Sequence, residues 1–233
     1  QTNVALVQAL AAKKEMLQNV SHELRTPLTM IMGYSTLLAE EELGPLTAEQ
    51  QEAIQVLTDQ SQRLHDMIER LLLLQSLDEM RLQTTACHLP SLLHRLLVSW
   101  RAYATQKGIR LTLDKENGEF PLLLLDAHLL EHVINNLLSN ALKFSPSDST
   151  VHVRLWTTEQ EAHMAISDQG MGIASDKQPY IFERFYQVDG TRTRKAGGVG
   201  IGLALCRKII QAHAGRIWVE SEGEGKGTTF HLS

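Results

Sequence analysis

The sequence predicts an α+β protein with two domains: an N-terminal antiparallel helical hairpin that forms a dimeric four-helix bundle, followed by a two-layer α/β sandwich with a mixed sheet and helices on one face. The first observation is length, because 233 residues suit one or two ordinary domains. The second is a sustained apolar repeat of helical type within residues 1–84. The third is an irregular alternation of short strands and helices over residues 85–233, which favours a mixed sheet.

Composition narrows the class of protein. Hydrophobic residues make up 43% and charged residues 21% of the chain, as in ordinary globular proteins. No apolar run approaches the roughly 18–20 residues that a membrane span requires. The net charge of −5 lacks the basic surface of a nucleic-acid-binding protein, so we expect no nucleic-acid partner. Two cysteines cannot build a disulfide framework, which favours a reduced, intracellular setting.

The N-terminal domain is predicted to consist of two long helices. The first covers about residues 4–40 and ends before Gly44 and Pro45, which break helices. Its apolar residues recur every seven positions and form a seam for another helix: Leu10, Leu17, Leu24, Ile31 and Leu38.

The second helix covers about residues 47–79. It begins with Thr47 as the N-cap and Gln50 as its capping-box partner. Its apolar stripe is interrupted at Ser61 and otherwise consists of Ile54, Leu57, Leu64, Ile68 and Leu71. One hairpin has too narrow a core to stand alone, and two hairpins make a four-helix bundle, so we expect a homodimer.

The C-terminal domain is predicted to contain three helices and six strands. The helices cover about residues 90–106, 126–144 and 201–214, and Asp126 caps the second of them. The strands cover about residues 109–113, 122–125, 151–156, 162–167, 216–221 and 228–232. Residues 122–125 are four consecutive leucines, which predicts a buried strand.

Residues 21–28, with the sequence SHELRTPL, place three reactive groups on the first helix. On an ideal helix His22 points about 200° away from Leu24, and Thr26 lies one turn from His22. The Glu23 carboxylate, beside the imidazole, can fix its tautomer and raise its nucleophilicity. On spacing alone, a solvated helix face with an incidental histidine explains the pattern equally well. A zinc site of the H-E-x-x-H type is excluded because the second histidine is missing.

Residues 135–144 place a second polar group on the predicted helix 126–144. Asn136, Asn140 and Lys143 fall within an arc of about 40°, with apolar residues on the opposite side. Two carboxamides and an amine on one face suit a hydrated divalent metal and phosphate oxygens. Taken alone, the polar side of an amphipathic helix is the simpler interpretation.

Two glycine-rich segments lie further along the chain. Asp168 ends a predicted strand and is followed by Gly170 and Gly172, which allow a ligand to approach the backbone closely. Its carboxylate can accept a hydrogen bond from an exocyclic amine. A cationic loop then leads into the last predicted helix, which is opened by three glycines: Gly198, Gly200 and Gly202. The first backbone N–H groups of that helix can hold phosphate. A third segment, residues 223–230, is most simply a hairpin turn.

The order of these motifs resembles that of the sensor histidine kinases of two-component systems, over essentially the whole chain. Residues 10–80 are similar to the dimerisation and phosphotransfer domain of that family. Residues 87–233 are similar to its catalytic ATP-binding domain, which belongs to the gyrase, Hsp90, histidine kinase and MutL superfamily. The matching motifs are the H box at 21–28, the N box at 136–144, the first glycine box at 168–173, the F box at 181–185 and the second glycine box at 197–205.

The resemblance implies a role for each of these residues. His22 would be the phosphoacceptor, Glu23 its acid/base partner and Thr26 the threonine of the phosphatase motif. Asn136 and Asn140 would form the N-box pair, with Asn140 the magnesium ligand and Lys143 the phosphate-binding lysine. The remaining expected nucleotide contacts are Asp168 on the adenine amino group, Gly170 and Gly172 in the adenine pocket, Tyr186, and Gly198, Gly200 and Gly202 in the lid, which Phe182 and Phe185 would anchor.

The implied activity is ATP-dependent autophosphorylation of His22 with Mg²⁺, then transfer of the phosphoryl group to an aspartate of a response regulator receiver domain. We expect the same protein to dephosphorylate that regulator and to act in the cytoplasm.

Departures from the family pattern occur at Leu129, His132 and Gln187. Two other classes stay open: a superfamily ATPase without phosphotransfer, and a non-enzymatic dimeric scaffold with a degenerate pocket. The chain starts at Gln1 without a leader, so we expect part of a longer protein, with any membrane attachment in segments outside this sequence.

Overall fold

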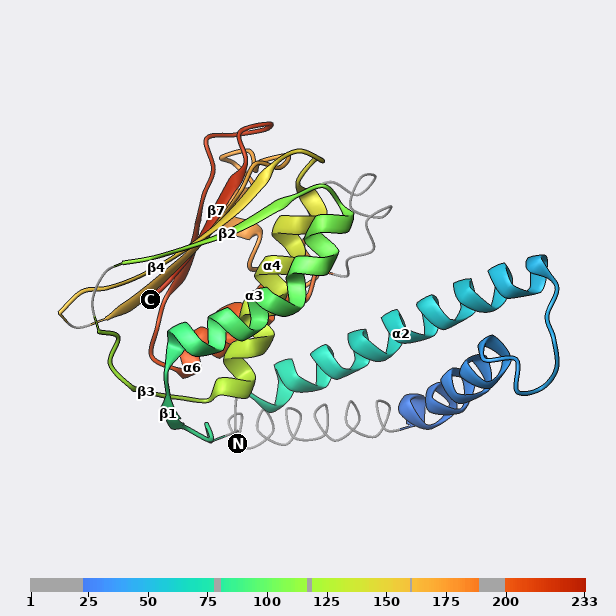
Figure 1. Ribbon diagram of the computed structural model, residues 1–233. Helices are drawn as coiled ribbons and strands as arrows, with labels where there is room; N and C mark the ends of the chain where they lie inside the picture. The colour runs from blue at the N-terminus through green and yellow to red at the C-terminus, as the bar shows by residue number, and fades with distance from the viewer. Residues whose placement is uncertain (1–22, 78–80, 117–118, 160, 189–199) are drawn as a thin grey trace, which may run out of the picture. The chain divides into compact units, whose positions relative to one another are not determined.

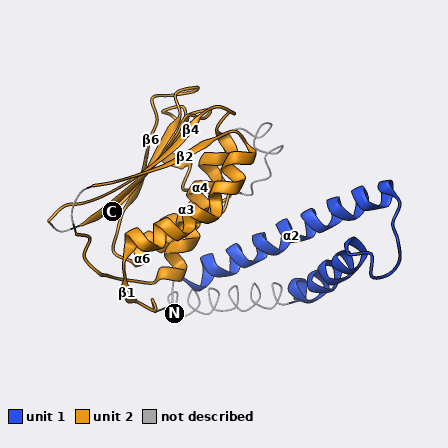
Figure 2. Cartoon of the chain, in the orientation of Figure 1, with its two compact units in different colours: residues 1–78 blue, residues 79–233 orange. Residues whose placement is uncertain are grey.

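The computed structural model describes residues 23–77, 81–116, 119–159, 161–188 and 200–233 of the chain (Figure 1). The chain divides into two compact units, residues 1–78 and residues 79–233, which Figure 2 shows in different colours. Among the helices of the described residues, none combines the length and the apolar character that crossing a bilayer would take.

The first unit contains two long helices joined by a short connection. Residues 23–39 are helical, and the second helix, α2, spans Ala48–Ser76. The predicted capping box at the start of α2 is confirmed. Thr47 Oγ1 accepts from the Gln50 N–H at 3.3 Å, and Gln50 Oε1 accepts from the Thr47 N–H at 2.9 Å. The turn uses Gly44 at φ 117°, a backbone angle that favours glycine.

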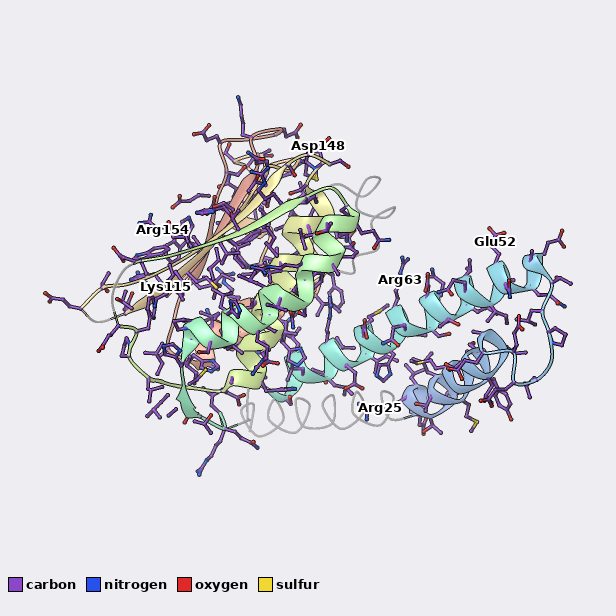
Figure 3. The ribbon with its side chains drawn as sticks, in the orientation of Figure 1. Arg25, Glu52, Arg63, Lys115, Asp148 and Arg154 are labelled. Atoms are coloured by element: carbon purple, nitrogen blue, oxygen red, sulfur yellow. The ribbon has the colours of Figure 1, made fainter. Side chains whose placement is uncertain are left out.

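The inner faces of the hairpin carry small and apolar side chains. Leu28 of the first helix and Ile68 of α2 are buried, and Ser61, one heptad before Ile68, is buried as well. Three residues before Leu28, Arg25, labelled in Figure 3, donates from Nε to Glu69 Oε1 at 2.8 Å. Because a partly exposed ion pair contributes only about 0–1 kcal/mol, apolar burial does most to hold the two helices together.

The second unit is a mixed five-stranded sheet covered on one face by three helices (Figure 1). The strand order is β2-β4-β5-β7-β6; only β2 and β4 run parallel, and the other neighbours are antiparallel. The strands are β2 (Arg110–Lys115), β4 (Thr150–Thr157), β5 (Ala162–Asp168), β6 (Ile217–Glu220) and β7 (Thr228–Leu232). The helices are α3 (Leu89–Gln106), α4 (Ala127–Phe144) and α6 (Gly202–Ala212). The predicted α+β class, with helices on one face, is confirmed.

The core of this unit lies between α4 and the sheet. Alternate residues of β4 point inward, so Val151, Val153 and Leu155 are fully buried. From α4 the predicted apolar side is buried, including Ile134 and Leu138. This leaves the opposite side of α4, which carries the N-box residues, outside the core.

The leucine run at residues 122–125 is a different kind of strand from the predicted one. β3 (Leu123–Leu125) pairs with β1 (Thr85–Cys87) in a separate two-stranded ribbon. Leu122 and Leu124 are 66% and 73% exposed, so the prediction of a buried strand is wrong. An apolar run specifies burial only where a second layer covers it. β1 escaped prediction because three residues are too few to show a periodicity.

Candidate active site

The structure describes the predicted phosphotransfer motif, residues 21–28, from Glu23 onward. The predicted phosphoacceptor His22 lies outside the described residues. Glu23 and Thr26 both lie on the helix over residues 23–39 and are exposed, whereas Leu28 is buried. The motif therefore presents its carboxylate and its hydroxyl on the outer surface of the hairpin.

Helix α4 carries the predicted N-box residues on one side. Asn136, Asn140 and Lys143 are half-buried, in contrast to the buried apolar residues between them. The Lys143 ammonium lies 5.0 Å from the centroid of the Phe144 ring. In the part of the chain that the structure describes, the Asn140 carboxamide makes no side-chain hydrogen bond, so its oxygen is available to a ligand.

Asn136 contacts the first turn of α6 and so brings two predicted site segments together. Its Nδ2 donates to Cys206 Sγ at 3.3 Å. A Cβ at Gly202 would overlap the Asn136 carboxamide, so only glycine lets α6 approach α4 this closely. The start of α6 has no side-chain cap, because the N-cap residue Ile201 offers none. Its first backbone N–H groups therefore lack a side-chain acceptor and suit an anion.

Asp168 ends β5 beside the first glycine box. Its Oδ1 accepts from the Gly170 N–H at 2.8 Å. Burial raises the pKa of the Asp168 carboxyl to about 6, and the N–H groups of Gly170 and Thr228, which favour the ionised form, offset part of that rise. A Cβ at Gly170 would lie 2.6 Å from the Phe144 carbonyl oxygen, so this turn packs against the end of α4.

The segment between β6 and β7 packs against the first glycine box, which sequence reasoning missed. A Cβ at Gly172, which has φ 67°, would overlap the Gly223 carbonyl oxygen. The Gly225 N–H donates to the Met171 carbonyl at 2.6 Å, and the Gly227 N–H donates to the Gly170 carbonyl at 3.2 Å. The repeated glycines of residues 223–227 were the available signal, since three of them within five residues exceed what one hairpin turn needs.

The F box contacts the described end of the second glycine box. The Phe185 N–H donates to the Gly200 carbonyl at 2.8 Å, and a Cβ at Gly200 would lie 2.7 Å from the Tyr186 carbonyl oxygen. Phe182 is buried and packs edge-on against Phe230, with ring centroids 6.3 Å apart. Phe185, in contrast, is exposed, and because residues 189–199 of the lid lie outside the described residues, its role as a packing anchor stays a prediction. The predicted lid residue Gly198 lies outside the described residues.

These contacts gather the predicted nucleotide residues around one side of α4. Asn136 contacts the start of α6, while the end of α4, one residue beyond Lys143, contacts the turn that holds Asp168. Among the described residues no group of three His, Cys, Asp or Glu side chains could hold a metal. A hydrated Mg²⁺ does not require such a group, because it keeps several waters and takes few protein ligands. The half-buried Asn140 carboxamide, on the same side of α4 as Lys143, therefore fits a ligand of a hydrated magnesium ion.

The chain matches two protein families in two separate segments. Residues 12–79 match the His Kinase A (phospho-acceptor) domain, and residues 125–233 match the histidine kinase-, DNA gyrase B-, and HSP90-like ATPase. Both segments agree with the positions of the motifs, since the first contains residues 21–28 and the second contains α4, both glycine boxes and the F box.

Known proteins resemble the chain over almost its full length. The circadian input-output histidine kinase CikA of Synechococcus elongatus is 37% identical over 231 residues, which are 97% of this chain and 30% of that protein. The sensor protein SrrB of Staphylococcus aureus is 33% identical over 222 residues, which are 94% of this chain and 37% of that protein. The chain thus spans about a third of the length of these curated relatives.

A solved structure agrees with these matches. The crystal structure of full-length ShkA in complex with AMPPNP has a TM-score of 0.80 and 28% identity, covering 94% of this chain and 45% of that one. The Acinetobacter baumannii histidine kinase AdeS shares the fold, with a TM-score of 0.63 and 21% identity over 91% of this chain and 95% of that one. With both domains and this motif order in place, the chain belongs to the sensor histidine kinases.

Proposed function

We propose that this chain is the core of a sensor histidine kinase that phosphorylates His22 from Mg-ATP and passes the phosphoryl group to an aspartate of a response regulator receiver domain. Residues 1–84 would form the dimerisation and phosphotransfer domain, and residues 85–233 the catalytic domain, acting in the cytoplasm. The observation that carries the proposal is the meeting of Asp168, the N-box face of α4 and the uncapped start of α6 in one region of the second unit.

Different residues of the proposed site would bind different parts of the nucleotide. The Asp168 carboxylate would accept a hydrogen bond from the adenine amino group, because with a pKa of about 6 it is mostly ionised at neutral pH. Lys143 and the first N–H groups of α6 would bind phosphate oxygens, with Tyr186 and the glycines of both boxes close to the nucleotide. Asn140 would hold Mg²⁺, which when bound supplies charge neutralisation. Phosphoryl transfer depends mainly on such positioning and neutralisation.

The transfer step uses Glu23, the exposed carboxylate next to His22. A ring nitrogen of His22 would attack the γ-phosphorus in line, forming a P–N bond while the bond from that phosphorus to the ADP oxygen breaks. Glu23, next in the chain and exposed on the helix, would take the proton that the imidazole loses. ADP leaves with the bridging oxygen. In the second transfer, a carboxylate oxygen of the regulator attacks the phosphorus, and the imidazole is the leaving group.

The surface of the hairpin supports a homodimer. Four large apolar side chains of the predicted seams remain far from buried in the single chain: Leu24 at 48%, Ile31 at 50%, Leu57 at 53% and Leu64 at 42% exposure. Burying a leucine fully contributes roughly 1.5–3 kcal/mol, so these residues favour association with a second hairpin. The proposed partners are thus a second copy of this chain and a receiver domain.

Labelling with γ-labelled ATP and Mg²⁺ tests the phosphotransfer proposal. We expect label on the protein that is acid-labile and base-stable, as a phosphoramidate is. His22→Gln should abolish labelling while ATP binding, measured by calorimetry, stays close to that of the wild type. The matched control is His94→Gln, which changes an exposed histidine on α3 and should label normally. Full labelling of His22→Gln would place the acceptor elsewhere, and ATP turnover without any label would favour a superfamily ATPase.

A further inference from the structure

Asp126 is a buried carboxylate on which three segments of the second unit meet. The residue is only 6% exposed and directly precedes α4. Its Oδ1 accepts from the Leu129 N–H at 3.2 Å, which caps the helix, and its Oδ2 accepts from the Gln83 N–H at 3.0 Å. Its own N–H donates to His213 Nε2 at 3.0 Å. Capping alone would need only the first of these bonds.

His213 joins the end of α6 to this point. It is the C-cap residue of α6, and its Nδ1 lies 2.8 Å from the Ile209 carbonyl oxygen. A carbonyl can only accept, so Nδ1 carries the proton, whereas Nε2 faces an N–H donor and must be the acceptor. Both bonds therefore require a neutral imidazole in one tautomer. The ring connects the last turn of α6 to the first residue before α4.

The segment that follows the helical hairpin along the chain is attached to the same point. Gln83 lies between the end of α2 at Ser76 and the start of β1 at Thr85. In the β1–β3 ribbon, Thr85 is paired with Leu125, the residue immediately before Asp126. The connecting segment is thus held at two neighbouring places to the start of the helix that carries the N box.

Helices α4 and α6 meet at a second place as well, near the proposed nucleotide site. Asn136, ten residues or about 15 Å beyond Asp126 along α4, contacts Gly202 and Cys206 at the start of α6. The two helices are therefore antiparallel and fixed to each other at both ends of their contact. A shift at the Asp126–His213 end would move the start of α6 relative to Asn136.

We propose that Asp126 and His213 are positioning residues for the nucleotide site: they hold α6 in register with α4 and make that register depend on the connecting segment at Gln83. The inference rests on the proposed function, because it is the assignment of α4 and α6 to the nucleotide that gives their register a consequence. Neither residue needs to touch ATP. Their effect reaches the site through Asn136 and the first turn of α6.

The first test compares two variants of His213 in the full chain. His213→Phe keeps a planar ring but removes the acceptor, whereas His213→Gln returns an oxygen near the place of Nε2. For His213→Phe we expect the KM for ATP in autophosphorylation to rise about three- to tenfold, the cost of one lost hydrogen bond. His213→Gln should recover most of that loss. The proposal is overturned if both variants raise KM equally, or if both lower the melting temperature and leave KM unchanged.

The second test separates the connecting segment from the helix cap. Asp126→Asn keeps an oxygen for the Leu129 N–H but turns an NH₂ group toward the Gln83 N–H. We expect retained helicity by circular dichroism and a KM for ATP raised about three- to tenfold. The matched control, Asp148→Asn, changes an exposed aspartate at φ 63° (labelled in Figure 3), where asparagine is tolerated, and should leave KM unchanged.

The wild-type protein distinguishes the two possible failures. If it neither binds Mg-ATP nor labels His22, the proposed function fails. If the wild type labels normally and Asp126→Asn has an unchanged KM, the proposed function stands and the positioning role is wrong. ¹⁵N NMR of the His213 ring adds an independent readout, since the proposal requires a neutral ring protonated at Nδ1 and a cationic ring or the other tautomer at pH 7 would contradict it.

Discussion

Asp168, the proposed adenine contact, is a carboxylate whose ionisation is made harder by burial. Its carboxylate is partly desolvated at the end of β5, which raises its pKa to about 6 from an ordinary 3.8. Two backbone N–H groups, from Gly170 and Thr228, hold the charged form in place. The group thus remains an acceptor at neutral pH although it is partly desolvated, which strengthens a hydrogen bond to a ligand donor.

Asp168→Asn should weaken ATP binding about tenfold to a hundredfold, because a hydrogen bond to a charged group contributes roughly 1.5–3 kcal/mol. Isothermal calorimetry with Mg-ATP measures the change. Asp176→Asn, an exposed aspartate in the segment that follows the first glycine box, is the matched control and should bind as the wild type does. An unchanged affinity in Asp168→Asn would place the adenine contact at another residue.

The same variant gives a pH test. The raised pKa means that ionisation is harder in the folded protein, so the contribution of Asp168 to stability is fully present below about pH 4 and is lost as the pH rises through 6. Asp168→Asn lacks this loss, so its melting temperature relative to the wild type should rise between pH 4 and pH 7. The wild-type advantage in ATP affinity should grow over the same range. Comparing the two proteins cancels the titration of the nucleotide phosphates.

Thr26 belongs to the phosphatase activity that the sequence predicts, the hydrolysis of the aspartyl phosphate of the regulator. Its hydroxyl lies on the exposed side of the first helix, one turn from His22, where it could hold the water that attacks a regulator's aspartyl phosphate. Thr26→Ala should therefore lose phosphatase activity toward a phosphorylated regulator and keep autophosphorylation. Thr29→Ala removes an exposed threonine whose hydroxyl bonds the Arg25 carbonyl at 2.9 Å, and should keep both activities. A parallel fall of both activities in Thr26→Ala would make the residue structural.

At the scale of elements, the features that sequence reasoning found are local in the chain. The capping box of Thr47 and Gln50 spans four residues, and the buried side of α4 follows from helical spacing within one segment. The features it missed join distant segments. β1 is a strand because Thr85 pairs with Leu125 of β3, and Gly172 is needed because Gly223 lies against it. Neither pairing leaves a periodicity in the sequence, and the repeated glycines of residues 223–227 were the available signal for the second one alone.

The packing of the two glycine turns predicts a specific sensitivity. Gly172→Ala would add a methyl group where the Gly223 carbonyl lies, in addition to the strain of alanine at φ 67°. Gly225→Ala has the same kind of strain, at φ 74°, but meets no atom within 4 Å. We expect Gly225→Ala to cost about 1–2 kcal/mol of unfolding free energy, and Gly172→Ala to cost clearly more and to weaken ATP binding. Urea unfolding measures both; equal losses would show that the two turns do not need this contact.

At the scale of the whole molecule, the two units differ in how completely they bury their apolar side chains. The second unit buries its apolar residues between α4 and the sheet, and Val151, Val153 and Ile134 are fully buried. The hairpin, by contrast, has only two helices with which to cover its seams, and Leu24 and Leu64 stay exposed. The apolar surface that stays exposed belongs to the same hairpin as the phosphotransfer motif, so association and phosphotransfer are proposed for the same unit.

The full chain should therefore be a dimer in solution, with a mass twice that of the 26.1-kDa chain by light scattering. Leu64→Glu should shift it toward the monomer, because burying a charged carboxylate without a partner is costly. Leu43→Glu is the matched control: Leu43 is exposed in the connection between the helices, outside the predicted seams, and its variant should remain dimeric. ATP binding should survive in the Leu64→Glu monomer, since the proposed nucleotide residues all lie in the second unit. A monomeric wild type, or a dimer that survives in Leu64→Glu as fully as in Leu43→Glu, would place the dimer contact outside this surface.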